Sequence, residues 1–204
     1  LEKATGGNNV ALGYKAGEDV QGGTNNIMLG KASGTSSSPA GSVTSSSNII
    51  CLGDDNIGNL FCVQSSINTS DRRDKADITN FTAGLDFIKK MQPVTYKWDR
   101  RSWYLPTDED GTVTDDDITK VTPDGSKKEN ITHVGFIAQE VEALEKEIGF
   151  ASDQNDRILT HLTEDGNKYG MKYDRLVTVL VNAVKDLSTK LEDAEARIQK
   201  LESS

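Results

Sequence analysis

The sequence predicts an α+β domain that ends in a C-terminal coiled coil and is preceded by an all-β segment. Three observations predict this fold class: a repeat rich in glycine and asparagine, then mixed helix and strand patterns, then a heptad repeat. We place the boundaries at residues 1–69, 70–175 and 176–204. Only 35% of the 204 residues are hydrophobic, so a core shared within an oligomer would compensate for a thin monomeric core.

Residues 1–69 are expected to form short strands that stack on one another. They contain a loose repeat, NNVALG (8–13), NNIMLG (25–30) and SNIICLG (47–53). Each copy is apolar between asparagine and glycine, two residues that tolerate a left-handed backbone. One copy buries few apolar atoms, so it must stack on other copies. Strands of several chains wound together and a β-helix within one chain both satisfy this requirement. The serine-rich segment 31–47 is expected to be a surface loop.

Residues 70–175 mix the two periodicities and predict an α+β domain. We expect a helix within 78–92, a strand at 93–99, a strand that passes into a helix at 133–148, and a short strand or hairpin at 168–176. Thr79 or Asn80 is the expected cap of the first helix, and Pro93 is expected to stop it.

Residues 176–204 predict a coiled coil. Apolar residues alternate by three and four over four heptads, a pattern that presents one stripe to partner helices. The stripe consists of Val177, Leu180, Val184, Leu187, Leu191, Ala194, Ile198 and Leu201. This pattern leaves two, three or four helices open, and a helix packed on its own domain is the alternative.

Charge and composition exclude several classes of function. A net charge of −9 disfavours binding to nucleic acid or an anionic membrane, because phosphate binding needs clustered cations. We expect no membrane insertion, since no apolar run approaches the length of a bilayer span. Cys51 and Cys62 lie in apolar surroundings and are expected to be buried free thiols. His133 and His161 lack a third partner of metal-binding type, so neither a metal site nor a cofactor is expected.

The sequence INTSDRRDK (67–75) contains the elements of a serine nucleophile with a lysine base. A serine hydroxyl attacks a carbonyl only when a base removes its proton, and Lys75 could be that base if it were neutral. Residues five apart do not share a face of a helix. Ser70 and Lys75 would therefore meet across a tight turn or between chains.

Three motifs resemble the endosialidase-type intramolecular chaperones at the C-terminal ends of phage tail fibres and tailspikes. They are SDRRDK (70–75), HVGFIAQEVEAL (133–144) and YDRLVTVLVNAVKDL (173–187). The resemblance implies an intertwined trimeric β-fibre segment followed by a chaperone domain with a trimeric coiled coil. Such a chaperone registers the fibre and then cuts itself off, which here would separate Thr69 from Ser70.

The resemblance also implies the roles of single residues. It makes the chain a serine-type endopeptidase that acts once, on itself, with Ser70 as nucleophile and Lys75 as general base. His133 and Gly135 match further functional positions of the family, and His133 could donate to the oxyanion. Asp71 and Arg73 within the motif are expected to support the site.

The acidic segment 105–130 has two interpretations. Its carboxylate run 107–117 could suggest calcium, but it lacks the alternating spacing of a calcium loop, so a solvated loop is favoured. The resemblance implies that 105–130 forms a protruding arm that grips the fibre.

The expected partners are two further copies of the chain and its own fibre segment, with a host surface receptor or glycan as a candidate partner of the fibre. We expect the protein in the virion tail fibre, assembled in the cytoplasm of a bacterial host, with the chaperone part released after cleavage. One alternative is a structural trimerisation or adhesion domain that does not cleave. Another is a protease that acts on other chains.

Overall fold

The computed structural model describes residues 1–62, 68–107 and 117–203. The chain folds into two compact units, each with its own apolar core. Unit 1 comprises Leu1–Leu60, Val94–Gly135 and His161–Gly170, and unit 2 comprises Phe61–Pro93, Phe136–Thr160 and Met171–Ser204. Within the described ranges, no helix is both long and apolar enough to cross a bilayer.

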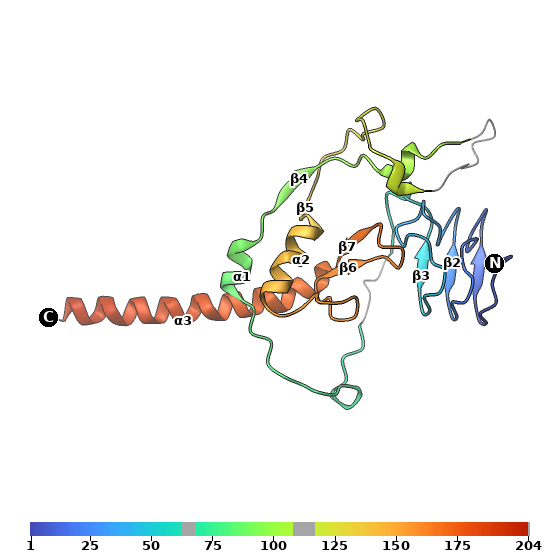
Figure 1. Cartoon of the computed structure of the whole chain (residues 1–204). Helices are drawn as coiled ribbons and strands as arrows, with labels where there is room; N and C mark the ends of the chain where they lie inside the picture. The colour runs from blue at the N-terminus through green and yellow to red at the C-terminus, as the bar shows by residue number, and fades with distance from the viewer. Residues whose placement is uncertain (63–67, 108–116, 204) are drawn as a thin grey trace. The chain divides into compact units, whose positions relative to one another are not determined.

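The three sequence copies in unit 1 form three stacked parallel strands. These are β1 (Val10–Leu12), β2 (Ile27–Leu29) and β3 (Ile50–Leu52), and Figure 1 shows them stacked in chain order. Equivalent residues pair, so the central residues Ala11, Met28 and Cys51 align. Met28 and Cys51 are buried with Ala16, Val20 and Val43 in the core of unit 1. We call residues 1–60 the β-coil.

Asparagine and glycine allow the coil to turn, as the sequence predicts. Asn8, Asn25 and Asn48 precede the three strands with φ of 61°, 56° and 64°. Gly13 and Gly30 follow strands with φ of 130° and 100°. A Cβ on Gly13 would lie 2.7 Å from the backbone of Gly30, so the glycines also permit close stacking.

A second asparagine in each of the first two copies links neighbouring turns of the coil. The side-chain oxygen of Asn9 accepts the Asn26 N–H at 3.0 Å, and that of Asn26 accepts the Ile49 N–H at 2.9 Å. Asn26 is fully buried, so its amide satisfies backbone groups that would otherwise be unpaired in the core. The three copies thus stack within one chain.

Two small sheets complete the strand content. β4 (Val94–Tyr96) pairs antiparallel with β5 (His133–Gly135), and β6 (Thr160–Leu162) pairs with β7 (Tyr169–Met171). The predicted strands at 93–99, at the start of 133–148 and within 168–176 are therefore present. Short 3₁₀ turns occur at Arg72–Asp74, Arg101–Tyr104, Ile118–Lys120 and Tyr173–Arg175.

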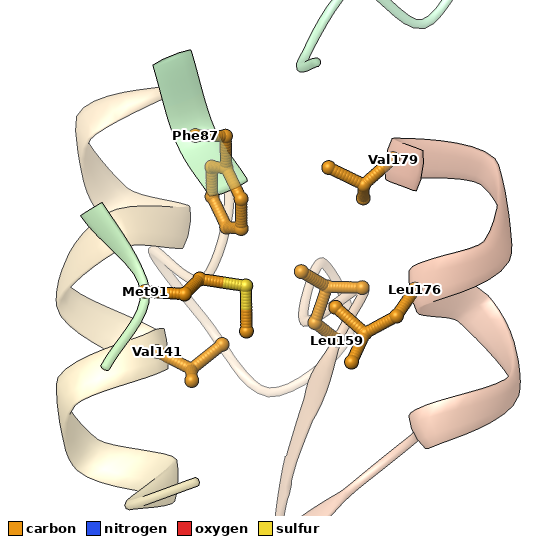
Figure 2. Close-up of a cluster of buried hydrophobic side chains, with 6 residues drawn as sticks. All are labelled: Phe87, Met91, Val141, Leu159, Leu176 and Val179. Carbon is orange, nitrogen blue, oxygen red and sulfur yellow. The ribbon is translucent and has the colours of Figure 1, made fainter. Parts of the chain in front are cut away.

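Three helices build unit 2: α1 (Leu85–Lys90), α2 (Ala138–Glu147) and α3 (Leu176–Glu202). Side chains from all three meet in one apolar cluster (Figure 2). Its members are Phe87, Met91, Val141, Leu159, Leu176 and Val179. The helical half of 133–148 is confirmed, with Val141 only 2% exposed in the core.

The first helix is shorter than the sequence predicts. It begins at Leu85, not after Thr79 or Asn80, because α3 holds the preceding residues extended. The Asn182 amide donates to the carbonyls of Phe81 and Ala83. The carboxylate of Asp186 then accepts the Leu85 N–H at 2.9 Å and acts as the cap from a distance of 101 residues.

A buried carboxylate fixes the segment that leads into β6. Glu145 of α2 is fully buried and accepts the backbone N–H groups of Ile158, Leu159 and Thr160 as well as the Thr160 hydroxyl. These donors replace water around the charge, so its burial is tolerated. They place Leu159 in the core between α2 and α3.

The expectation of two buried cysteines is wrong for one of them. Cys51 is buried beneath the sheet at 3% exposure, whereas Cys62 is exposed. Cys62 lies beyond β3 and next to Phe61, which is 92% exposed, because these two residues pack on neither of the described cores. Apolar neighbours in sequence do not bury a thiol when the neighbours themselves are exposed.

Helix α3 has two apolar faces. Leu176, Val179 and Ala183 are buried against the other elements of unit 2, whereas the predicted heptad stripe is exposed. The exposed members Val177, Leu180, Val184, Leu187, Leu191, Ile198 and Leu201 have 48–75% of their area accessible. From Val184 onward every described residue of α3 is exposed, so the described part of the chain buries none of them, although Asp186 contacts Leu85.

The core assignment predicts a clear difference between two leucine truncations. Leu159→Ala should lower the free energy of unfolding by about 2–5 kcal/mol, because it opens a cavity among α1, α2 and α3. Leu60→Ala, at a position 72% exposed, should change it by less than about 0.5 kcal/mol. Chemical denaturation at matched protein concentration measures both, and equal effects would contradict the assigned core.

Candidate functional site

A single 3₁₀ turn brings Ser70 and Lys75 together in one chain. The turn Arg72–Asp74 reverses the backbone, and the Lys75 N–H donates to the Arg72 carbonyl at 3.2 Å. The Lys75 ammonium nitrogen Nζ then donates to Ser70 Oγ at 2.6 Å. Of the two arrangements that the spacing left open, this chain adopts the tight turn.

Asp71 and Arg73 stabilise that turn. The Asp71 carboxylate accepts the Arg73 backbone N–H at 2.9 Å and also the Arg73 guanidinium, 2.6 Å from its Nη2. The guanidinium hydrogen bond, followed by the backbone hydrogen bond, lowers the pKa of Asp71. The carboxylate therefore remains ionised at neutral pH and caps the turn.

The Ser70–Lys75 pair and the residues around it in sequence are open to solvent. Thr69, Ser70 and Lys75 are exposed, as is every other residue from 68 to 80. A lysine takes a proton from a serine only as the neutral amine, which desolvation or cationic neighbours favour. The arrangement thus brings the candidate nucleophile and the candidate base into contact, and the described part of the chain does not desolvate the lysine.

His133 and Gly135 lie in unit 1, whereas Ser70 and Lys75 lie in unit 2. The imidazole of His133 stacks on Tyr96 with ring centroids 5.5 Å apart, and its Nε2 is 3.7 Å from Glu129 Oε2. Within the described part of the chain, Nε2 makes no hydrogen bond. Gly135 is buried in β5 opposite Val94. Pairing between β4 and β5 fixes the position of both residues on the strand.

The expected arm at 105–130 belongs to unit 1 where it is described. Tyr104 Oη accepts the Lys127 N–H at 2.8 Å, and the Glu129 N–H donates to the Trp98 carbonyl at 2.9 Å. Most of the acidic run 107–117 lies outside the described residues, which omit 108–116. Among the residues that are described, no three side chains of metal-binding type lie together.

A match to a known protein family begins at Ser70, the first residue of the Ser70–Lys75 turn. Residues 70–150 match the model of a family described as "Chaperone of endosialidase", which is named as a peptidase family. The matched segment begins at Ser70 and includes two of the three motifs that carry the resemblance. The match supports an endosialidase-type chaperone domain that includes residues 70–150. A search of curated proteins gives no significant match.

The Asp71–Arg73 contact predicts a measurable titration. The carboxyl carbon of Asp71, followed by NMR, should titrate below the unfolded value of about 3.9. Because the folded pKa is the lower one, the stabilisation of the turn is present above pH 4 and is lost as the pH falls through the folded pKa.

Arg73→Gln should return the pKa of Asp71 toward its ordinary value, while Arg72→Gln, an equal charge change at an exposed neighbour, should leave it lowered. An identical response in both variants would show that general charge, and not this contact, stabilises the carboxylate.

Proposed function

We propose that residues 70–204 form an intramolecular chaperone that trimerises, registers a phage tail fibre and then cuts the chain between Thr69 and Ser70. One coincidence carries the proposal. The matched chaperone segment begins at the residue whose hydroxyl accepts a hydrogen bond from Lys75. The boundaries 1–69, 70–175 and 176–204 follow from the same cut and from the start of α3.

The proposed cleavage is an acyl shift followed by hydrolysis. Neutral Lys75 takes the proton of Ser70 Oγ, and Oγ attacks the carbonyl carbon of Thr69. The bond between that carbon and the Ser70 nitrogen breaks as the nitrogen gains a proton, which leaves an ester between Thr69 and Ser70 Oγ. Water then hydrolyses the ester, so Thr69 ends as a carboxylate and Ser70 as a free amine with its hydroxyl restored.

Assembly is the proposed trigger. The Ser70–Lys75 pair is formed in the single chain but is exposed, so the described part of the chain removes no water from Lys75. A lysine that stays an ammonium cannot accept the proton. Coverage by a neighbouring chain would remove water from Lys75 and would strengthen any oxyanion donor. His133 is the proposed donor and Gly135 the proposed point of close backbone approach. Cleavage would then follow correct association and not precede it.

The exposed stripe of α3 is the first support for a trimer. An isolated helix is marginal in water, yet α3 extends beyond Ala183 for about five turns in which the described part of the chain buries no residue. Apolar residues at every a and d position of this stretch would form the core of a coiled coil. Because the buried face of α3 uses other positions, the helix can serve its own unit and the oligomer together.

The outer face of the β-coil is the second support. The strand residues that flank the central residue are apolar and exposed in β1 and β3, where Val10, Leu12, Ile50 and Leu52 show 43–72% of their area. Such a row of exposed apolar residues on a sheet marks an interaction surface. Contact between three coils would bury it and would complete a fibre segment within the virion. Assembly in the host cytoplasm and a host receptor or glycan as ligand belong to this proposal.

Cleavage makes physical sense for a fibre that assembles slowly. Pairing between distant strands folds slowly and invites misassembly, so a helical trimer that forms first would align the chains. Cleavage breaks the covalent link to this template. Once the template dissociates, the fibre has no easy route for unfolding and its stability becomes kinetic.

Ser70→Ala tests the proposed cleavage directly. Freshly expressed wild-type protein should give two fragments on denaturing electrophoresis, with intact masses that join at Thr69–Ser70, whereas Ser70→Ala should remain whole because it lacks the nucleophile. Lys75→Met should slow cleavage by at least about a hundredfold, as expected for loss of a general base. Lys89→Met, at an exposed lysine of α1, is the matched control.

A wild-type chain that stays whole would leave the alternative, a structural trimerisation or adhesion domain. Cleavage of an added peptide by the wild-type chain with turnover would instead indicate a protease that acts in trans.

The proposed trimer predicts that a charge introduced at a d position of α3 disrupts assembly, whereas one outside the a and d positions does not. In uncut Ser70→Ala protein, light scattering should give three times the mass of one chain. Leu187→Asp should reduce it to that of one chain, because a d-position charge would be buried. Lys190→Asp, outside the a and d positions, should leave the trimer intact. In the wild-type background Leu187→Asp should also suppress cleavage, and cleavage at full rate in a monomer would refute the assembly trigger.

A further inference from the structure

Unit 1 contains residues from both sides of the proposed cut. The β-coil precedes Ser70, whereas Val94–Gly135 and His161–Gly170 follow it. Contacts between these parts would therefore join the two products after cleavage. The densest such contact involves the turn between β6 and β7, Thr163–Lys168, which the sequence analysis did not single out.

Glu164 at this turn holds a loop of the β-coil through several donors. Its carboxylate accepts the backbone N–H groups of Thr44, Ser45 and Ser46 at 2.9–3.1 Å. It also accepts the hydroxyls of Thr44, at 2.8 Å, and of Ser45. Partial burial raises the pKa of Glu164, but the hydrogen bonds from Ser45, Thr44 and Ser46 outweigh it and leave the pKa well below its ordinary value. The acceptor is therefore charged at neutral pH, which strengthens each bond.

Two neighbours of Glu164 extend the contact. Asp165 Oδ2 accepts the Ser42 N–H at 3.1 Å. Lys168 Nζ donates to the Ser38 carbonyl at 2.7 Å and to Asp55 Oδ2 at 2.6 Å, where the two side chains are only 14% and 4% exposed. A paired charge at this depth is costly to separate, so the contact is strongest at Lys168.

Hydrogen bonds within the turn Thr163–Lys168 fix its conformation. The Asn167 N–H donates to Asp165 Oδ1 at 3.0 Å, and the Lys168 N–H donates to Thr163 Oγ1 at 3.0 Å. Gly166 adopts φ of 72°, which the tight turn requires. Local bonds thus fix the direction of the three charged side chains, and docking costs little further ordering.

We propose that the turn Thr163–Lys168 is a docking element that grips the serine-rich loop Ser42–Ser46 at the last turn of the β-coil. Four of its acceptor contacts are with backbone N–H groups and two with small hydroxyls, so the fitting partner is a compact serine- or threonine-rich loop that presents its amides. The element would fix one turn of the fibre against the chaperone while the strands align. This inference rests on the proposed chaperone function but does not require cleavage.

Hydrogen exchange of the uncut Ser70→Ala chain tests the grip. Glu164→Ala should speed exchange at the amides of Thr44, Ser45 and Ser46 by roughly tenfold each, the effect of one lost hydrogen bond. The ladder amides of β2 should remain unchanged. Glu2→Ala removes an equal charge from unit 1, at an exposed glutamate that makes no hydrogen bond or ion pair within the described residues, and should change nothing.

Unchanged exchange at Thr44–Ser46 in Glu164→Ala would overturn the inference, as would an equal rise in the Glu2→Ala control. If Glu164→Ala also loosens β2, Asp165→Ala decides. It removes the acceptor of the Ser42 N–H and should speed exchange at that amide with β2 protected, and unchanged exchange at Ser42 in Asp165→Ala would overturn the inference.

Wild-type protein gives a second measurement once it has cut itself. Its two products should elute together on native size exclusion, and combining Glu164→Ala with Lys168→Met should separate them. If the wild-type products separate under the same conditions, the turn does not hold the β-coil after cleavage, and this part of the inference is wrong. A chain that never cuts would refute the cleavage proposal while leaving the exchange experiment fully informative.

Discussion

Burial of one face of α3 against α1 and α2 is the contact on which unit 2 depends. Leu176 and Val179 complete its small core, and Asn182 and Asp186 on the same helix hold Phe81 to Leu85 in place. The chain has few apolar residues, so a single helix supplies both the core and the caps of its neighbours. The same economy leaves the heptad stripe exposed, and in the proposed trimer this stripe would link folding of the unit to assembly.

At the candidate site, the local sequence positions Lys75 on Ser70 but does not make the lysine a base. A short turn with an aspartate cap and a neighbouring arginine suffices to place Lys75 on Ser70, and all of these residues lie within six positions. Activation of the lysine requires removal of water, which local sequence cannot provide at an exposed position. A site divided in this way would remain inactive until the surrounding structure is complete.

The β-coil and the chaperone segment are less separate than their compositions indicate. Three carboxylates and one ammonium, Asp55, Glu164, Asp165 and Lys168, join stretches more than 100 residues apart in sequence. Charged groups carry this contact because the serine-rich loop offers amides and hydroxyls and almost no apolar surface. Polar docking of this kind gives direction and register, where a small apolar patch would give little of either.

The sequence by itself determined the elements with strong local signals. Asparagine and glycine set the turns of the coil, the alternation by three and four set α3, and the spacing in SDRRDK matches the turn that pairs Ser70 with Lys75. Tertiary structure alone decided the start of α1, the exposure of Cys62, the buried role of Glu145 and the turn Thr163–Lys168. The start of α1, the role of Glu145 and the turn Thr163–Lys168 depend on partners between 13 and 130 residues away, and periodicity over a short window carries no information about such distant hydrogen bonds. Cys62 is exposed because its apolar neighbours in sequence are exposed too.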